Sequence, residues 1–341
     1  MSRPVRIGTR ASLLATTQSE LVAALIRDRL GRETELVEVT TEGDRTQAEG
    51  TPLEQAGGTG VFVGALRDAL LAGEVDVAVH SLKDLPTATP EGIALAAVPL
   101  REDPRDVVVA RDGLTLGELP VGARLGTGSP RRVAQVEALG LGLDVVGVRG
   151  NVDTRIAKVR SGEYDAVLLA RAGLARIGRL EEVTEVLDPL QVLPAPGQGA
   201  LAVECRADDD LVTDLAALDD RGSRAAVEAE RAVLATLEGG CSAPIGALAE
   251  LVEGEDGEEL WVRAIALSRD GALSVRMSAT GEPHDAAGVG TRLAKEMLAD
   301  GAGDLDAGPE AGPEAGPAAR PAARPAAEPA AGPETDRVHD A

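Results

Sequence analysis

The chain contains 341 residues, 44% of them hydrophobic, which is enough for two or three domains that each bury a core. Its net charge of -23 disfavours general binding to nucleic acid or anionic lipid, because both of these partners attract a basic surface. No apolar run is long enough to span a membrane, and the first residues lack the pattern of a signal peptide. We therefore expect a cytoplasmic protein with no nucleic-acid or membrane partner.

Strand and helix patterns alternate through the first half of the chain. It opens with a strand over 5–8 and a helix over about 12–30, whose first turn Ser12 can cap. The alternation that follows predicts an α/β fold with mainly parallel sheets. Further strands are expected over 36–39, 75–80, 107–110, 123–126, 145–148 and 166–169, and further helices over 61–71, 130–139, 152–160 and 174–180.

The second half predicts a return to the first lobe and then a small third domain. The turn-rich segment 194–199 leads into an apolar strand over 200–205, which indicates that the chain crosses back from a second lobe and leaves a cleft between the two. A helix over 223–237 and another over 286–298 enclose three expected strands. Those strands cover 245–252, 260–267 and 273–278.

These patterns predict the domain organisation. The tail is rich in Pro, Ala and Gly with almost no large apolar side chain, so it cannot offset its ordering entropy by burial. We expect lobe 1 at 1–98 with 197–218, lobe 2 at 99–196, a third domain at 220–300 and a disordered tail at 301–341.

The two cysteines stand in different surroundings. Cys205 lies within an apolar run, where a free cysteine usually behaves as a small buried hydrophobe. Cys241 lies in a loop of small residues, from which its sulfur could act as a nucleophile or could be an incidental thiol. A large core and a reducing compartment make a disulfide between them unnecessary.

A lysine and an aspartate follow one of the expected buried strands. Lys83 and Asp84 stand at its carboxyl end, before Pro86, and this edge of an α/β sheet is where ligands bind. The Asp84 carboxylate could accept a proton, hold a cationic N–H donor or cap a turn, and its local sequence leaves these roles open.

Arginines cluster where strands give way to helices. Ser129 can cap a helix and Pro130 fits its first position, which places Arg131 and Arg132 in the first turn. Cations there oppose the helix dipole at roughly 0.3 to 1 kcal/mol each, so the arrangement favours a bound anion. The same device recurs at Arg149 and Arg155, and at Arg10 with Ser12, whereas Arg176 is a weaker candidate because exposed helical arginines are usually just solvated.

Eight stretches in this order resemble the porphobilinogen deaminases, also called hydroxymethylbilane synthases, over residues 3 to about 300. They are Arg-Ile-Gly-Thr-Arg-Ala-Ser12, Gly-Gly-Thr-Gly-Val-Phe-Val63, Val-His-Ser-Leu-Lys-Asp-Leu-Pro86, Arg-Glu-Asp-Pro-Arg-Asp106, Ser-Pro-Arg-Arg132, Arg-Gly-Asn-Val-Asp-Thr-Arg155, Pro-Gly-Gln-Gly-Ala200 and Glu-Gly-Gly-Cys241. The resemblance implies two lobes like those of periplasmic binding proteins, a third domain that carries the cysteine, a monomer and no metal. It also implies a transferase that condenses four porphobilinogen molecules, with loss of ammonia, into hydroxymethylbilane.

The resemblance also implies the role of each candidate residue. A dipyrromethane cofactor would be joined to Cys241 by a thioether, and Asp84 would be the catalytic carboxylate. Phe62 would belong to a lid over the cleft. Lys83, Ser129, Arg131, Arg132 and Arg155 match cofactor-binding positions, and Arg10, Ser12, Arg149, Arg155 and Arg176 match substrate-binding ones.

Some positions depart from the family pattern. Gln55 and Thr59 stand where many members carry lysines, which weakens any role for charge on that loop. Asp153 adds a negative charge near Arg149 and Arg155 that would weaken their affinity for carboxylates. The competing interpretation is a noncatalytic two-lobed protein that binds a polycarboxylate, which would share the cleft but would have no use for Cys241.

Overall fold

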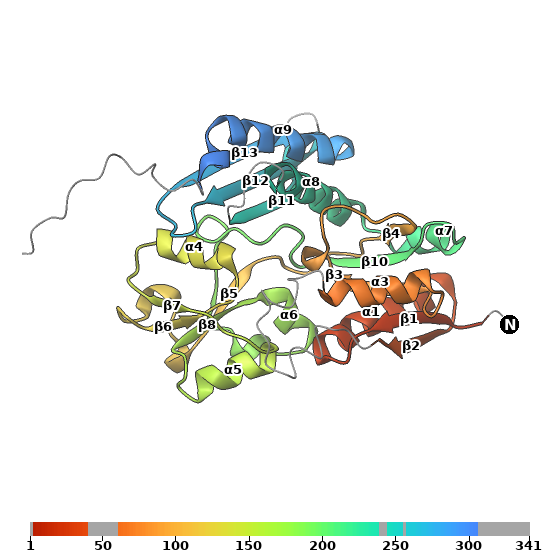
Figure 1. Ribbon diagram of the computed structural model, residues 1–341, viewed down its shortest axis with the longest axis horizontal. Coiled ribbons are helices and arrows are strands. Elements are labelled where there is room, and N and C mark those ends of the chain that lie inside the picture. Colours follow the sequence, from red (N-terminus) through yellow and green to blue (C-terminus); the bar gives the residue numbers. More distant parts are fainter. Residues whose placement is uncertain (1–2, 40–60, 239–243, 255–256, 306–341) are drawn as a thin grey trace, which may run out of the picture. The chain divides into compact units, whose positions relative to one another are not determined.

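The computed structural model describes residues 3–39, 61–238, 244–254 and 257–305, which form an α/β fold with three sheets (Figure 1). Gln55, Thr59, Cys241 and residues 306–341 of the expected tail therefore lie outside the described residues. The expected start of the tail at 301 is wrong, because residues Ala302–Asp304 form a turn of 3-10 helix and Ala302 and Leu305 are buried in the core of the third domain. No helix of the described part is long and apolar enough to cross a membrane.

The first lobe is a five-stranded sheet in the order β2-β1-β3-β10-β4. Ile7 and Val77 share a core with helix α1 (Leu13–Leu30), whereas Ala78 packs with helix α3 (Val61–Leu71). Because successive residues of a strand point to opposite faces, α1 and α3 cover opposite faces of the sheet. The strands are β1 (Val5–Thr9), β2 (Thr34–Glu38), β3 (Val77–Ser81), β4 (Ile93–Ala97) and β10 (Leu201–Arg206).

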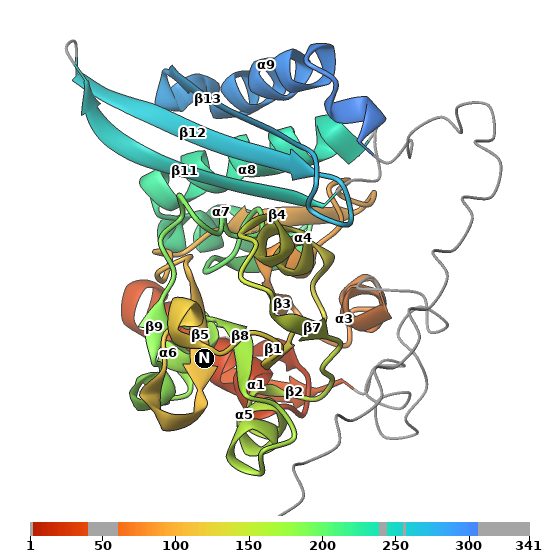
Figure 2. The ribbon, with the colours of Figure 1, turned by 90° about the vertical axis from the view of Figure 1, so that its left-hand side faces the viewer.

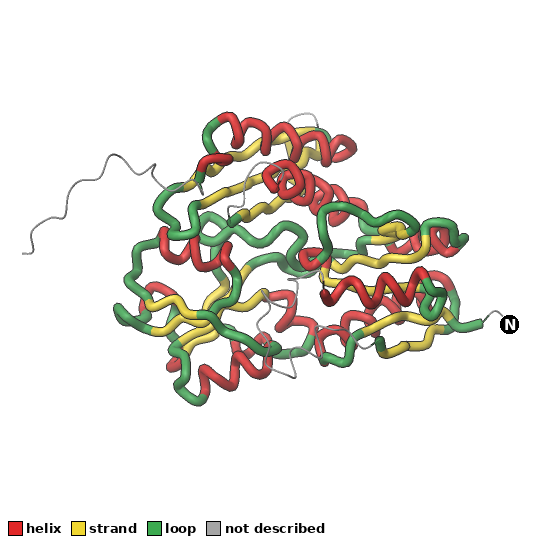
Figure 3. Tube along the Cα trace, in the orientation of Figure 1, coloured by secondary structure: helices red, strands yellow, loops and turns green. Residues whose placement is uncertain are grey.

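The second lobe is a five-stranded sheet in the order β7-β6-β8-β5-β9. Helix α4 (Pro130–Ala138) covers one face, and α5 (Val152–Arg160) and α6 (Arg171–Arg176) cover the other, so helices border the strands of both lobes (Figure 3). The strands are β5 (Asp106–Ala110), β6 (Arg124–Gly126), β7 (Asp144–Val146), β8 (Ala166–Ala170) and β9 (Glu185–Val186).

The expectation of mainly parallel sheets holds for the direction of the strands but not for their pairing. In each lobe four of the five strands run in the same direction, and the strand that has crossed from the other lobe runs against them, so it pairs antiparallel with both of its neighbours. The crossing strands are β10 in lobe 1 and β5 in lobe 2, and Figure 1 shows β10 beside β3 although all of lobe 2 separates them in sequence. A strand that enters a lobe from its neighbour runs against the strands already there. The expected crossing after residue 199 is confirmed.

The remaining elements form a small α/β unit. Its antiparallel strands β11 (Ile245–Gly254), β12 (Gly257–Leu267) and β13 (Ser274–Gly281) share one core with helices α8 (Arg221–Glu238) and α9 (Ala286–Ala299) (Figure 2). The opposite face of this sheet packs Leu248, Ile265 and Leu267 against Ala134 of α4 and Leu193. The second face of the sheet is thus buried in part, and the expected third domain is present.

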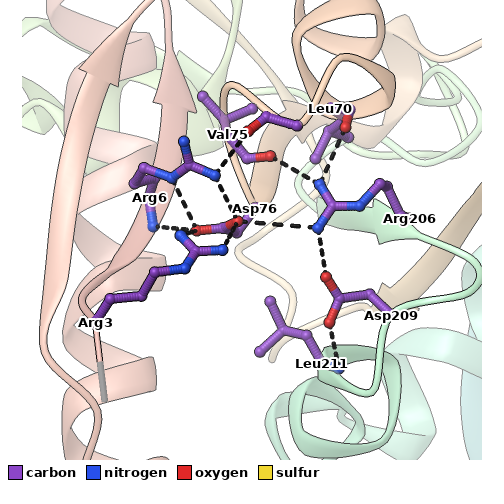
Figure 4. Close-up of polar contacts among 9 residues, drawn as sticks. Arg3, Arg6, Leu70, Val75, Asp76, Arg206, Asp209 and Leu211 are labelled. Carbon is purple, nitrogen blue, oxygen red and sulfur yellow. Dashed lines mark hydrogen bonds and ion pairs between the residues drawn. The ribbon is translucent and has the colours of Figure 1, made fainter. Parts of the chain in front are cut away.

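A cluster of charged groups fixes the start of β3, the strand that leads to Lys83 and Asp84 (Figure 4). The Asp76 carboxylate accepts hydrogen bonds from Arg3 and Arg6 at 2.7 to 3.2 Å. Burial acts to raise the pKa of Asp76, but the bonds from Arg6 and Arg3 outweigh it and hold the pKa well below its usual range. Arg206 of β10 donates to the carbonyl of Leu70, which ties the end of α3 to the same cluster.

One buried carboxylate joins the third domain to both segments that cross between the lobes. Glu230 of α8 is fully buried and accepts two hydrogen bonds from Arg101, at 2.7 and 2.9 Å. Its oxygens also accept from the backbone N–H groups of Gly197, at 2.6 Å, and of Ala249, at 2.8 Å. Arg101 and Gly197 belong to the two crossing segments, so one side chain holds three parts of the chain together.

We predict that Glu230→Ala lowers the free energy of unfolding by roughly 3–5 kcal/mol, because it leaves the Arg101 guanidinium and two backbone N–H groups buried without an acceptor. Chemical denaturation followed by circular dichroism measures the loss. Glu228→Ala is the matched control, since Glu228 is exposed on the same helix and its ion pair with Arg224 spans 3.5 Å. The control should change stability by about 0.5 kcal/mol or less, and an equal loss in both variants would contradict the prediction.

Candidate functional site

A cleft of about 760 Å³ lies between the two lobes. Its walls come from the ends of strands and the beginnings of helices, where unpaired backbone groups and charged side chains can meet a ligand. Eight of the twelve residues predicted for the site line it. They are Arg10, Ser12, Lys83, Asp84, Arg132, Arg149, Arg155 and Arg176.

The other four predicted residues do not line the described cleft. Ser129 and Arg131 lie beside it at the start of α4. Phe62 is the second residue of α3, and its side chain lies outside the described part of the structure. Cys241 falls within the undescribed residues 239–243, which follow directly on α8.

Asp84 is carried by a short turn that follows β3. Residues Leu82–Asp84 form one turn of 3-10 helix, and buried Leu82 anchors it in the core of lobe 1. Asp84 itself is half-buried and faces the cleft. Among the described residues no side chain or backbone group forms a hydrogen bond with its carboxylate. Asp84 is therefore available to a cationic or N–H-bearing ligand.

Lys83 is held by a glutamine of the returning crossover. Its Nζ donates to Oε1 of Gln198 at 3.2 Å. Loss of water around the ammonium group, together with the Arg132 and Arg131 guanidinium groups, outweighs the attraction of Asp84 and Asp106 and lowers the pKa of Lys83 to about 8. Lys83 is thus protonated at neutral pH, and a nearby anion stabilises its charged form.

Arg131 and Arg132 meet a carboxylate of the protein rather than only a bound anion. The fully buried Asp106 accepts from both guanidinium groups at 2.7 Å, and Arg131 also donates to the carbonyl of Leu193. The inference that these cations favour a bound anion is therefore incomplete, because Asp106 already compensates part of their charge inside the fold. Arg132 still lines the cleft.

Ser129 occupies the position before the first turn of α4, and Pro130 is the first helical residue, as predicted. The Ser129 side chain makes no capping hydrogen bond, so the expected cap is absent. Its backbone N–H instead donates to the Thr127 hydroxyl at 3.2 Å.

Two arginines of lobe 2 enter the cleft partly stripped of water. Arg155 is half-buried, its Nε donates to the Gly150 carbonyl at 2.9 Å, and burial followed by the charge of Arg132 lowers its pKa. Arg176 ends α6 and donates to the Gly199 carbonyl at 2.6 Å. Burial lowers the pKa of Arg176 to about 10, which contradicts the view of it as a solvated helical arginine. A nearby anion stabilises the charged form of both arginines.

The first lobe contributes Arg10 and Ser12. Arg10 is half-buried, and Ser12 caps α1 as predicted, because its Oγ accepts from the N–H of Ala15 at 3.3 Å. The hydroxyl hydrogen of Ser12 can still be donated to a ligand. Arg149 lines the cleft on the side of lobe 2 and is exposed.

Asp153 does not stand unpaired among the cleft arginines. Its carboxylate forms an ion pair with Arg179 at 2.7 Å. The expected weakening of carboxylate binding by Asp153 is offset by this partner, although Asp153 does line the cleft.

Sequence reasoning missed two residues that organise the site. Gln198 donates to the Pro104 carbonyl and to Asp106, both at 2.7 Å, while it accepts from Lys83. Gln198 and Asp106 both lie within stretches that carry the family resemblance, and Gln198 stands between two glycines with left-handed φ angles of 76° and 88°. Those two signals could have drawn attention to Gln198.

The donor set of the cleft suits a dipyrromethane group with its carboxylate side chains. Lys83 and five arginines can bind carboxylates, and the one half-buried carboxylate without a bound partner, Asp84, can accept from pyrrole N–H groups. The residues present in the described part therefore fit the group. Its expected attachment point, Cys241, lies outside that part.

Comparisons with known proteins agree with this arrangement. Residues 5–214 match the dipyrromethane cofactor binding domain of porphobilinogen deaminase, and residues 224–299 match its C-terminal domain. Porphobilinogen deaminase 1 of Streptomyces coelicolor is 58% identical over 313 residues, which cover 89% of this chain and 97% of the relative. A porphobilinogen deaminase of Nocardia farcinica is 57% identical over 311 residues, 89% of this chain and 88% of the relative.

Among solved structures, a periplasmic substrate-binding protein of an ABC transporter from Coxiella burnetii aligns with a TM-score of 0.41 and 14% identity, covering 63% of this chain and 91% of that chain. The two domain matches together cover both lobes and the third domain. On these matches the chain belongs to the porphobilinogen deaminase family.

Proposed function

We propose that the protein is a transferase that condenses four porphobilinogen molecules, with loss of ammonia, into the linear tetrapyrrole hydroxymethylbilane on a dipyrromethane primer bound to Cys241. The observation that carries this proposal is the cleft itself, in which an unpaired carboxylate, that of Asp84, is surrounded by Lys83 and five arginines. Family membership supplies the substrate class and the cofactor.

The cations of the cleft bind the acid side chains of the pyrrole rings. Each porphobilinogen unit brings an acetate and a propionate, and guanidinium groups bind such carboxylates through paired hydrogen bonds. Lys83, Arg132 and Arg155 would hold the primer, with Arg131 and Ser129 supporting them from the start of α4. Arg10, Ser12, Arg149 and Arg176 would hold the incoming substrate together with Arg155. The primer supplies a pyrrole ring whose free α-carbon is nucleophilic.

Asp84 stabilises the positive charge that develops on the substrate. When ammonia leaves the aminomethyl group of porphobilinogen, its pyrrole nitrogen becomes cationic. The Asp84 carboxylate accepts a hydrogen bond from this N–H group, and it takes part in the later loss of the proton from the α-carbon. Because Asp84 is half-buried, water screens this attraction less than it would at the surface. Phe62 would belong to a lid over the rings, as the family resemblance implies.

A noncatalytic polycarboxylate-binding protein is the disfavoured alternative. Such a protein gains from the same cations, but an unpaired carboxylate beside the ligand weakens the binding of anions. The placement of Asp84 in the cleft therefore favours catalysis.

We further propose that the protein acts as a cytoplasmic monomer with domain boundaries at 1–98 with 197–218, 99–196 and 220–300. The three separate sheets support this division.

Cys205 is fully buried in the core of lobe 1, where burial raises the pKa of its thiol to about 11, so it is not a second nucleophile.

We predict that the purified protein carries a two-ring pyrrole adduct on Cys241, and that Cys241→Ser abolishes both the adduct and the formation of hydroxymethylbilane, because serine cannot form the thioether. Intact-mass analysis with peptide mapping measures the adduct. Cys205→Ala is the matched control and should keep both. Turnover by Cys241→Ser at the wild-type rate would refute the proposed function.

We predict that Asp84→Asn keeps the fold and the adduct but lowers kcat by roughly 10²- to 10⁴-fold, because the amide preserves shape and removes charge. Steady-state release of hydroxymethylbilane measures the effect. Asp112→Asn is a suitable control, since Asp112 is exposed and asparagine tolerates its left-handed φ of 58°. Near-normal turnover in Asp84→Asn would remove Asp84 from the mechanism.

We predict that primer assembly on the apoprotein depends on the protonation of Lys83. Its ammonium group loses its proton as the pH rises through about 8 instead of near the usual 10.5, so the wild-type assembly rate should fall above pH 8. Lys83→Arg stays charged over this range. The ratio of the wild-type rate to the Lys83→Arg rate, followed by mass spectrometry, should fall several-fold between pH 8 and 9, and a constant ratio would contradict a role for the ammonium group.

A further inference from the structure

The position of Asp84 is set by its backbone. Its carboxylate has no hydrogen-bond partner among the described residues, so no neighbouring side chain holds it in place. If Asp84 is the catalytic carboxylate, as proposed above, the groups that hold residues 82–87 decide where its charge lies. An error of about 1 Å at such a group can cost roughly 100-fold in rate.

The segment before Asp84 is held within the lobes. The N–H of Leu82 donates to the Ala200 carbonyl at 3.0 Å, and Lys83 donates to Gln198. The N–H of Leu85 closes the turn by donating to the Leu82 carbonyl at 3.1 Å.

The backbone carbonyls directly after Asp84 are held by a guanidinium group from the third domain. Arg231 of α8 donates through Nη1 to the carbonyl of Leu85 at 3.3 Å. Its Nη2 donates to the carbonyls of Pro86 at 2.6 Å and Thr87 at 3.2 Å. Three consecutive backbone carbonyls therefore accept from one side chain, directly after the proposed catalytic residue.

Packing on both sides of Arg231 strengthens this attachment. Leu85 is buried in one cluster with Val227, which lies one helical turn before Arg231 and so on the same face of α8. At the end of the helix, the Thr87 hydroxyl donates to Glu238 at 3.1 Å. Residues 85–87 are thus fixed along α8 by an apolar contact, a guanidinium group and a carboxylate.

The charge of Arg231 is directed to backbone dipoles. No ion pair involving Arg231 occurs in the described ranges, and burial lowers its pKa although Glu204 acts in the opposite direction. Burial thus disfavours the charged form of Arg231, and the three backbone carbonyls stabilise it. Each of them accepts a charge-assisted hydrogen bond, which orients the backbone of residues 85–87.

We infer that Arg231 is a positioning residue for the condensation reaction, because it holds the backbone directly after Asp84 onto helix α8 and so fixes the carboxylate in the cleft. This inference rests on the proposed function. It assigns to the third domain a part in catalysis that is separate from carrying the cofactor cysteine.

The test compares Arg231→Met and Arg231→Lys in the full-length holoenzyme, with adduct content measured by intact mass. Arg231→Met should lower kcat by roughly 10- to 100-fold with less than about a twofold change in KM for porphobilinogen, because the carboxylate-binding cations are untouched. Arg231→Lys can still donate to the same carbonyls and should recover most of the lost kcat.

Arg224→Met is the matched control. Arg224 lies on the same helix and also binds lobe 1. It donates to the Asp219 carboxylate at 2.7 Å and to the backbone carbonyls of Leu95 and Ala96 at 3.3 and 3.4 Å. Its substitution should lower the thermal midpoint at least as much as Arg231→Met while kcat stays within about twofold. Equal losses of kcat in the two methionine variants would show that Arg231 contributes only stability, and would overturn the inference.

Asp84→Asn separates this inference from the proposed function. If Asp84→Asn loses turnover while Arg231→Met keeps a normal kcat, Arg231 is not a positioning residue and the inference fails alone. If Asp84→Asn keeps turnover, the catalytic assignment fails and the inference falls with it. Should Arg231→Met not fold, Arg231→Gln against Arg224→Gln gives the same comparison, because glutamine removes the charge and cannot reach all three carbonyls. An equal kcat in these two glutamine variants would overturn the inference.

Discussion

The buried pairing of Asp106 with Arg131 and Arg132 is the interaction on which the charge of the cleft depends. Burial alone would raise the pKa of Asp106, but the two guanidinium groups hold it well below its usual range, and so the carboxylate remains ionised. One negative charge between two positive charges leaves an excess of one positive charge at the start of α4. The fold therefore keeps a cationic wall in place before any ligand arrives, without leaving two guanidinium groups to repel each other unopposed.

This pairing extends into the two segments that cross between the lobes. Asp106 is the first residue of β5, the strand that enters lobe 2, and Gln198 belongs to the segment that returns to lobe 1. Gln198 contacts Lys83, while Arg101 joins the Gln198 carbonyl, at 2.8 Å, to the buried Glu230 of the third domain. Hydrogen bonds thus link the cleft to all three sheets through two short stretches of chain.

The sequence allowed much of this arrangement to be predicted, and the omissions have a common cause. Helix boundaries such as 61–71 and 152–160, the buried Cys205 and the cap at Ser12 follow from local patterns, and all are confirmed. The pairing of Arg131 with Asp106 joins residues on different elements, and no local rule of helix dipoles includes a carboxylate brought in by another strand.

The strands that were missed show the same limitation. The edge strand β9 has only two residues, which is too few to separate from a loop by periodicity. The edge strand β4 lies in a continuous apolar run over 93–98, a pattern that is compatible with a buried strand but was not assigned as one. The antiparallel direction of the crossing strands depends on which lobe the chain comes from, which is a property of the whole fold. Likewise, the lowered pKa of Lys83 depends on burial and on two arginines distant in sequence.

The strongly acidic composition and the polyanionic ligand are compatible because electrostatic forces in salt solution act over short distances. At physiological ionic strength, exposed charges are screened over about 8 Å, so most of the net charge of -23 acts weakly on a ligand already inside the cleft. Within the cleft, partial burial of Arg155 and Arg176 reduces this screening and strengthens each contact with a carboxylate. The local excess of cations therefore determines binding.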